Sequence, residues 1–292
     1  VMKDAISKGM PMTLGHNFFE DYESRFSKIN RVTCPTGMPE IDKKDILNGG
    51  LAKGEIGCLI GATGTGKSHF MVHVGADDSN LCNIPSNEVI ERKDEVLEMY
   101  ENTELGRLII KEYPTGSATV MTLRNHIEKL LLKSFVPSLI IIDYADIMRS
   151  SRKFDSLRHE LKLIYEELRN MAMDMNLPIW TASQSNRDGA NATVVGLENM
   201  SEAYGKAMVA DVILSLSRKP MEKSTGAGRL FVAKNRAGRD GMLFPLHLDT
   251  AKSKFKILDD AEMSLEDVTT SDKQSMKNLL KEKWAEVNAK ND

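Results

Sequence analysis

Residues 61–68 have the types and spacing needed to bind a chain of phosphates. They match the pattern G-x-x-x-x-G-K-[ST], whose glycines let backbone N–H groups turn toward the phosphates. In this pattern Lys67 reaches the β- and γ-phosphates, and the Ser68 hydroxyl is a magnesium ligand. The residues that we expect to contact the nucleotide are Gly61, Thr63, Gly64, Thr65, Gly66, Lys67 and Ser68. The sequence therefore predicts a site for ATP, or another nucleoside triphosphate, with Mg²⁺.

Asp143 is a second candidate magnesium ligand. It follows the apolar run 139–142, which we expect to be a strand buried on both faces. A carboxylate at the end of such a strand is the Walker B arrangement, which holds the metal directly or through water. Asp146, a little further along, fits a solvated or capping group better.

The chain around these motifs alternates between strand and helix patterns. Apolar runs predict strands over residues 56–60, 108–110, 139–142, 178–183, 212–216 and 230–233. Apolar positions at helical spacing predict helices over 120–133 and 156–175. Two later runs, 242–248 and 255–257, are typical of hairpin strands that extend a sheet. This order predicts an α/β fold with a mostly parallel central sheet flanked by helices.

Three segments are expected along the chain. Residues 1–32 carry apolar side chains at helical spacing and predict a short linker helix, which either packs on its own domain or docks on the next subunit of a ring. Residues 33–260 form the predicted ATPase domain. The polar segment 261–292 predicts a helical tail that either docks a partner or folds back. Because the sequence begins at Val1 and not at Met, we also expect a further N-terminal domain before it.

Composition argues against a membrane protein and against binding nucleic acid through the whole surface. No apolar run approaches the roughly 20 residues that span a bilayer. Three scattered cysteines without metal-ligand spacing indicate a reducing, cytosolic setting. The net charge of −3 means that any contact with DNA must come from local loops.

Taken in order, the motifs resemble those of the DnaB-type hexameric replicative helicases, including those of T-even-like bacteriophages. The similarity runs from Thr33 to Leu258. The run I-I-I-D-Y-A-D-I-M ending at Met148 resembles the family's Walker B strand, and S-Q-S-N-R over 183–187 is similar to its S-Q-x-N-R. The segment K-N-R-A-G over 234–238 resembles its K-x-R-x-G turn.

The resemblance implies a RecA-like fold and roles for three residues. Gln184 would sense the γ-phosphate and relay the nucleotide state to a DNA-binding loop. Lys234 and Arg236 would reach into the neighbouring subunit's nucleotide site, with Arg236 as arginine finger. Arg239 is an alternative finger, and a basic hairpin turn without a partner is the other interpretation of this segment.

Contacts with DNA are expected from two places. The basic loop after the Walker B strand supplies Arg152 and Lys153, and the segments resembling the family's DNA loops supply Arg187 and Lys206. Ser201 stands where many family members have an arginine, which weakens the transfer of individual contacts. Residues 189–196 suit either a moving, strand-gripping element or a disordered surface loop.

One expected element is missing from the sequence. In RecA-fold ATPases a strand after the phosphate-loop helix ends in a glutamate that orients the attacking water. Here the helix pattern runs directly into D-D-S-N at 77–80, and Glu88 and Glu91 lie too far along to fill the role. Either the protein lacks this element or the sequence joins residues across a gap after Ala76, the alternative that we favour.

The resemblance implies ATP-driven translocation on single-stranded DNA and duplex unwinding by a homo-hexamer. It also implies a primase and a helicase loader as candidate partners, and the bacterial host cytoplasm as the location of a phage-encoded protein. Two other functions stay open on the same fold, a RecA- or RadA-type recombinase filament and a signalling ATPase that does not bind DNA.

Overall fold

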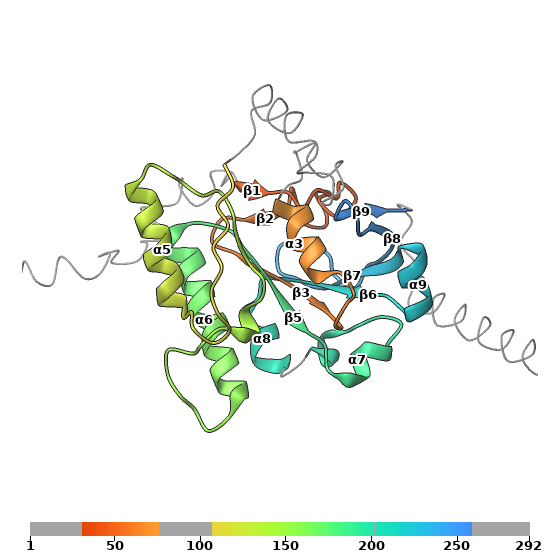
Figure 1. The fold of residues 1–292 in the computed structure, drawn as a ribbon. Helices are drawn as coiled ribbons and strands as arrows, with labels where there is room; N and C mark the ends of the chain where they lie inside the picture. Colours follow the sequence, from red (N-terminus) through yellow and green to blue (C-terminus); the bar gives the residue numbers. More distant parts are fainter. Residues whose placement is uncertain (1–30, 76–106, 201–202, 259–292) are drawn as a thin grey trace, which may run out of the picture. The chain divides into compact units, whose positions relative to one another are not determined.

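The computed structural model describes residues 31–75, 107–200 and 203–258, and the description below is confined to these ranges. The described residues from Thr33 onward belong to one compact unit of the chain. Its centre is a seven-stranded sheet in the order β4-β5-β3-β6-β7-β8-β9 (Figure 1). Outside the described residues lie most of the predicted linker helix (residues 1–30), the Ala76 junction, Glu88, Glu91 and the tail after residue 260.

Four strands of the sheet run parallel and three extend it in antiparallel order. The parallel strands are β3 (Ile56–Gly61), β4 (Ile140–Ile142), β5 (Ile179–Gln184) and β6 (Val212–Ser217). The antiparallel strands are β7 (Ala227–Asn235), β8 (Leu243–Asp249) and β9 (Lys254–Ile257). A separate two-stranded sheet joins β1 (Thr33–Cys34) to β2 (Leu51–Ala52).

Helices cover both faces of this sheet. The described helices are α3 (Lys67–Gly75), α5 (Val120–Leu132), α6 (Leu157–Met175), α7 (Arg187–Asn191), α8 (Ala203–Val209) and α9 (Pro220–Thr225), with α3 on one face of the sheet and α6 on the other. Two short 3-10 turns, η2 (Ala145–Ile147) and η3 (Leu197–Asn199), complete the described elements. None of the described helices is long and apolar enough to cross a membrane.

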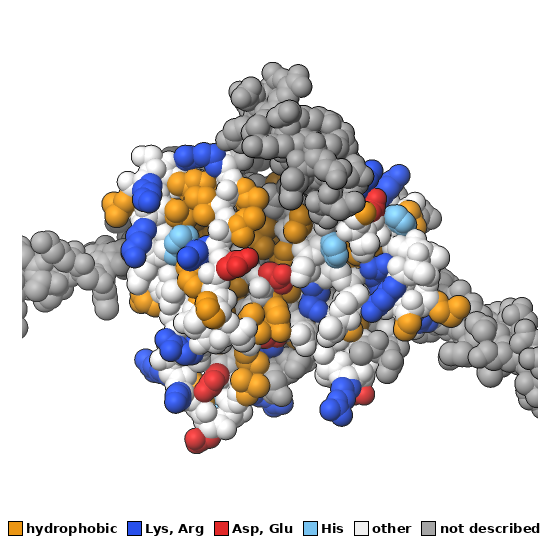
Figure 2. All heavy atoms as spheres, in the orientation of Figure 1, with side chains coloured by type: hydrophobic (Ala, Val, Ile, Leu, Met, Phe, Trp, Pro, Cys, Tyr) orange, Lys and Arg blue, Asp and Glu red, His pale blue; other side chains and the backbone are white. Residues whose placement is uncertain are grey.

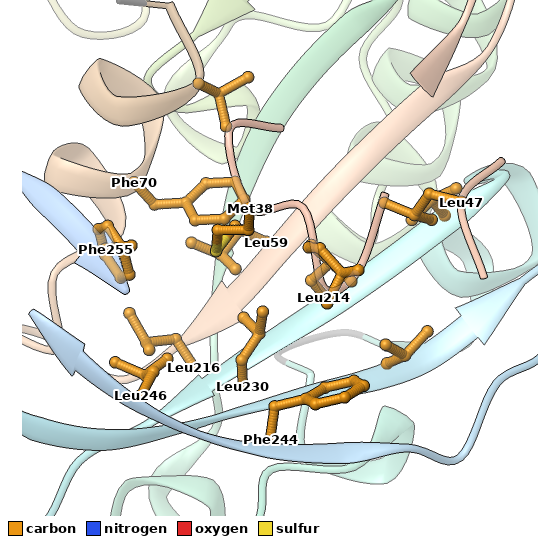
Figure 3. Close-up of a cluster of buried hydrophobic side chains, with 14 of the residues drawn as sticks. Met38, Leu47, Leu59, Phe70, Leu214, Leu216, Leu230, Phe244, Leu246 and Phe255 are labelled. Carbon is orange, nitrogen blue, oxygen red and sulfur yellow. The ribbon is translucent and has the colours of Figure 1, made fainter. Parts of the chain in front are cut away.

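Alternate residues of β3 point into two separate hydrophobic cores, as the period of a strand requires. Leu59 faces the core that contains α3, whereas Cys58 and Ile60 face the core that contains α6. In the first core, Phe70 of α3 packs edge-on against the ring of Phe255 (Figure 3). It packs in the same way against the ring of Trp180, and both ring centroids lie 5.6 Å from that of Phe70. The sheet is therefore a central layer, and α3 is fixed against it.

Most of the expected elements are present. The helices α5 and α6 match the predicted 120–133 and 156–175 closely, because caps mark their ends: Thr119 accepts from the Thr122 N–H, and Asn176 is left-handed with φ 50°. The predicted strands at 56–60, 178–183, 212–216 and 230–233 are confirmed as β3, β5, β6 and β7, and the two later runs as β8 and β9.

Two predictions about strands are wrong. Residues 108–110 are not a strand, and the side chains of Leu108 and Ile110 are 74% and 79% exposed. Residues 140–142 do form β4, but the strand is half-buried and not covered on both faces. The reason is its place in the sheet, since among the described strands β4 pairs only with β5 and forms one edge.

Candidate nucleotide-binding site

The phosphate loop lies between the end of β3 and the start of α3, where the pattern requires it. Gly64 and Gly66 have φ of 71° and 111°, which side chains rarely tolerate. A Cβ on Gly66 would also lie 2.5 Å from Leu248 Cδ2. Because α3 begins at Lys67, the unpaired N–H groups of its first turn and the positive end of its dipole face the loop.

Two side chains shape the loop from within. Thr65 is buried, and its hydroxyl donates to the Ala62 carbonyl at 2.8 Å, so it closes the turn. Lys67 Nζ donates to the carbonyls of Gly61 and Ala62 at 2.9 Å each. Burial lowers the pKa of Lys67, while the nearby carboxylates of Asp143 and Asp146 oppose that shift. The ammonium is thus held within the curve of the loop.

Parallel strands bring the other predicted residues to the same edge of the sheet. Gly61, the last residue of β3, pairs with Gln184, the last residue of β5. Asp143 follows β4, whose Ile142 pairs with Thr181 of β5. The Gln184 amide donates to the Tyr144 hydroxyl at 3.1 Å. The carboxyl ends of three neighbouring strands therefore hold the loop, the acid and the amide together, the usual ligand-binding edge of an α/β sheet.

Two exposed oxygen donors at this edge suit a magnesium ion. Ser68 in the first turn of α3 and Asp143 after β4 both have exposed side chains. Hydroxyl and carboxylate oxygens are ligands that Mg²⁺ prefers, and the ion usually takes its remaining ligands from phosphates and water. The described residues contain no cluster of three or more His, Cys, Asp or Glu that would form an all-protein metal cage. The residues present therefore fit a magnesium ion that binds together with a nucleotide.

Arg218 supports the loop but is not singled out by any sequence pattern. It follows β6 directly and is 7% exposed. Its guanidinium donates to the carbonyls of Thr65 at 3.4 Å, Ala227 at 3.1 Å and Lys223 at 3.3 Å. Desolvation lowers the pKa of Arg218, with Glu222 opposing. Its position at the end of a buried parallel strand, next to β3, is the one signal that could have found it.

Basic side chains gather beside this edge. Figure 2 shows Lys and Arg side chains over the region of α9. Lys223 lies beside the loop, with its Nζ 3.4 Å from the place that a Cβ on Gly64 would take. The surface around the loop is therefore cationic on the α9 side, which favours an anionic ligand.

The interpretation of Asp146 as a solvated or capping group is wrong. Its carboxylate lies 2.8 Å from the ammonium of Lys206 and accepts the hydroxyl of Ser183 at 2.8 Å. Lys206, predicted to contact DNA, is only 1% exposed. The structure contradicts that prediction, because the ammonium is used in a buried ion pair.

Lys234 and Arg236 lie at the opposite end of the sheet from the loop. Asn235, between them, pairs with Val212 at the start of β6, whereas Gly61 pairs with Leu216 near its end. Lys234 Nζ donates to the Ala207 carbonyl at 2.6 Å and the Ala210 carbonyl at 2.7 Å, at the end of α8. Burial, followed by the charge of Arg236, lowers the pKa of Lys234.

The predicted finger is engaged within its own chain. Arg236 donates to the Met208 carbonyl at 2.7 Å and to Asp211 at 3.1 Å, and its side chain is 45% exposed. Arg239, the alternative finger, is exposed and lies 3.5 Å from Asp45. The structure does not bring these basic residues together with the phosphate loop of the same chain.

The remaining candidates for DNA contacts are at the surface. Arg152, Lys153 and Arg187 are all exposed, and Arg187 begins α7 after the Asn186 cap. The segment 189–196 is partly anchored, since Ser215 donates to the buried Val195 and Arg229 donates to Thr193 at 3.0 Å. The sequence predicted either a moving, strand-gripping element or a disordered surface loop here, and neither prediction includes such anchoring.

Fold and loop together first define the class of protein, a P-loop α/β domain of the RecA-like kind. A solved DnaB-like replicative helicase, studied with its interactions with primase, superposes with a TM-score of 0.67 at 16% identity over 88% of this chain and 71% of that one. A solved ATPase domain superposes with a TM-score of 0.64 at 17% identity over 89% of this chain and 99% of that one. These likenesses establish the fold.

The sequence then gives the family. The model of the DnaB-like helicase C terminal domain matches residues 79–257, more than half of the chain, and the chain belongs to this family. A DnaB-like replicative helicase of Enterobacteria phage T4 is 28% identical over 74% of this chain and 53% of its own length. A probable plasmid replicative DNA helicase of Chlamydia psittaci is 24% identical over 75% and 54%. The chain spans about half the length of these two relatives.

Proposed function

We propose that this chain is the ATP-hydrolysing motor of a ring-shaped replicative helicase that moves on single-stranded DNA. One observation supports this proposal more strongly than the other observations do. The phosphate loop, Asp143 and Gln184 meet at one edge of the sheet, while Lys234 and Arg236 lie at the other end. A nucleotide site that uses both groups needs two copies of the chain, as a ring provides.

Each residue at the loop has a defined task in ATP hydrolysis. Backbone N–H groups of the loop and the Lys67 ammonium would hold the β- and γ-phosphates, and Ser68 and Asp143 would hold Mg²⁺. The metal would neutralise charge that develops on the phosphate oxygens. Gln184 would report the state of the γ-phosphate, because its amide can exchange the Tyr144 hydroxyl for a phosphate oxygen.

The neighbouring subunit would supply the cationic side of the site. A planar guanidinium such as that of Arg236 stabilises the charge on a transferred phosphoryl group, an effect on the order of a thousandfold or more in rate. Forming that contact requires Arg236 to leave the Met208 carbonyl, which its partly exposed side chain permits.

DNA would be held by few contacts per subunit, summed around the ring. Arg152, Lys153 and Arg187 are exposed cations on loops, suited to phosphate contacts that carry no sequence information. A homo-hexamer, a primase and a helicase loader are the partners that this function implies, and one solved relative is described with its interactions with primase.

A signalling ATPase of the same fold is the second candidate. A KaiC-like protein of Pyrococcus horikoshii superposes with a TM-score of 0.50 at 16% identity. The two functions differ in whether DNA controls ATP turnover. A recombinase filament, the third member of this group, would form extended filaments and not closed rings.

The test is ATP hydrolysis and duplex unwinding by the purified chain, with and without single-stranded DNA. We expect DNA to stimulate hydrolysis, and Lys67→Ala to abolish both activities, because the phosphates lose their side-chain cation. Lys256→Ala, an exposed lysine on β9, is the control and should change neither. Hydrolysis that ignores DNA would favour the signalling candidate, and unimpaired unwinding by Lys67→Ala would refute the mechanism.

A further inference from the structure

A lysine in the last turn of α9, Lys223, lies over the phosphate loop. Its Nζ is 3.4 Å from the place that a Cβ on Gly64 would take, and apart from the chain neighbours of Gly64 no other described atom lies within 4 Å of that place. Gly64 and Lys223 are both exposed. An ammonium group therefore stands at the open side of the loop, where a bound ligand can reach it.

A buried arginine fixes the backbone of α9 to the backbone of the loop. Arg218 donates to the Thr65 carbonyl at 3.4 Å and to the Lys223 carbonyl at 3.3 Å. It is packed closely, since a Cβ on Gly228 would lie 2.7 Å from Arg218 Cγ. Because one guanidinium contacts both segments, the backbone of Lys223 is held near the loop although its side chain is exposed.

A residue of β8, Leu248, forms a second link between α9 and the loop. Its backbone N–H donates to the carbonyl of Gly226, the residue that ends α9, at 2.7 Å. Its Cδ2 lies 2.5 Å from the place that a Cβ on Gly66 would take. This link does not involve Arg218, so two separate contacts hold the end of α9 beside the loop.

The acid next to Lys223 in the sequence already has a partner. Glu222 forms two hydrogen bonds with the guanidinium of Arg229 on β7, at 2.7 and 2.8 Å, and accepts the backbone N–H of Lys219 at 2.6 Å. Within the described part of the chain, Lys223 takes part in no ion pair. Its charge is therefore available to a bound anion.

The two sides of the phosphate loop differ in charge. Asp143 follows β4 and Gln184 ends β5, on one side of β3 in the sheet, whereas α9 follows β6 on the other side. Burial lowers the pKa of Lys67 inside the loop, and the carboxylates of Asp143 and Asp146 oppose that shift. These acids repel phosphates, and a lysine on the α9 side offsets them. Lysine is a common phosphate ligand because its ammonium is a compact charge with three donors.

We propose that Lys223 is a second phosphate ligand of this site, supplied by the same chain as the loop, and that it binds the phosphates of a nucleoside di- or triphosphate. This inference rests on the proposed function, because it takes the loop to be a nucleotide site. The contact lies outside the glycine pattern, which contains Lys67 as its single cation. Removing Lys223 weakens nucleotide binding without abolishing it, since Lys67 and the loop N–H groups remain.

The test uses two variants of Lys223 and one matched control. Lys223→Met removes the ammonium and keeps an apolar stem, whereas Lys223→Arg keeps the charge. The control is Lys129→Met, an exposed lysine in the last turn of α5, which packs in the core on the opposite face of the sheet from α3. Both methionine variants remove a favourable charge from the end of a helix, so the effect through the helix dipole is matched.

Thermal unfolding and the affinity for a fluorescent ATP analogue are measured, the affinity at low and at high salt. We expect Lys223→Met to melt like the control and to bind about five- to tenfold more weakly at low salt, the lower end for a hydrogen bond to a charged group because the site is exposed. The difference should shrink at high salt, where ions screen the charge. Lys223→Arg should stay within about twofold of the parent, since it keeps a cation for the phosphates. Lys129→Met should match the parent.

The outcomes separate this inference from the function on which it rests. Unchanged affinity in Lys223→Met would overturn it, and so would an equal loss in Lys223→Arg or a loss that ignores salt, because α9 would then act through packing. Weak binding with a melting temperature below that of Lys129→Met would overturn it for the same reason. A parent chain that does not bind the analogue would remove the nucleotide site itself. ATP turnover that ignores DNA would remove the helicase proposal and leave the role of Lys223 standing.

Discussion

Single glycines in the phosphate loop have different physical roles, and Gly66 is the most restricted. Its φ of 111° and the 2.5 Å approach of Leu248 Cδ2 to an added Cβ both oppose a side chain. We expect Gly66→Ala to weaken binding of a fluorescent ATP analogue by about tenfold or more, since backbone N–H groups must turn inward to reach the phosphates.

The matched control for Gly66→Ala is Gly116→Ala. Gly116 also has a positive φ, 70°, but nothing lies within 4 Å of an added Cβ, and it precedes α5, not the loop. Both substitutions strain the backbone, so both should lower the melting temperature, and only the first should change nucleotide affinity. Equal affinities in the two variants would mean that the loop tolerates a side chain at Gly66.

The elements of this fold were predictable where their patterns were long. The apolar run at 56–60 and the helical spacing of apolar residues at 156–175 are local signals. Both predictions are confirmed because the apolar face of the helix packs against the sheet that contains the strand. The run at 108–110 is short, and no described strand pairs with it. For β4, the apolar pattern could not show that the strand lies at an edge, because edge position is a property of topology.

The residues of the candidate site also fall into two groups, those that the sequence predicted and those that it missed. The phosphate loop was predicted from its glycine pattern, Asp143 from its place after an apolar strand, and Gln184 from the family resemblance; parallel strands bring all three to one edge. The ion pair of Asp146 with Lys206 was missed because a charged residue usually implies an exposed one, and its partner lies far away in the sequence. The placement of the first group is observed, and the roles of its members stay predictions.

The packing of α3 links core and site, and it can be tested through Phe70. This side chain is fully buried and contacts Trp180 and Phe255. We expect Phe70→Ala to cost about 3 to 5 kcal/mol of unfolding free energy, measured by denaturant titration. It should also weaken nucleotide binding, because α3 begins at Lys67. Met121→Ala, on an exposed position of α5, should do neither; an unchanged affinity in Phe70→Ala would show that the loop holds its shape without α3 packing.

At the scale of the assembly, the proposed function places the two halves of a nucleotide site on separate parts of the chain's surface. The phosphate loop lies at the carboxyl ends of the parallel strands, and Arg236 lies near the start of β6. A head-to-tail arrangement of copies brings unlike surfaces together and closes into a ring when the rotation permits. Hydrolysis would then depend on assembly, and a subunit that lacks one half would still form a complete site with a neighbour that has the other half.

Mixing two inactive variants tests this arrangement directly. Lys67→Ala lacks a working loop but keeps Arg236, whereas Arg236→Ala lacks the finger but keeps the loop. If the finger acts on the neighbouring subunit, mixed assemblies contain complete sites wherever an intact loop meets an intact Arg236, about a quarter of the interfaces after random mixing in equal amounts. We therefore expect each variant alone to be nearly inactive and the mixture, prepared before nucleotide is added, to recover measurable ATPase activity.

If Arg236 served the loop of its own chain, no mixture could recover activity, because every subunit would carry one damaged half. The same outcome would follow if Arg236 had only the structural contacts with Asp211 and the end of α8, so a mixture that stays inactive would contradict the shared site.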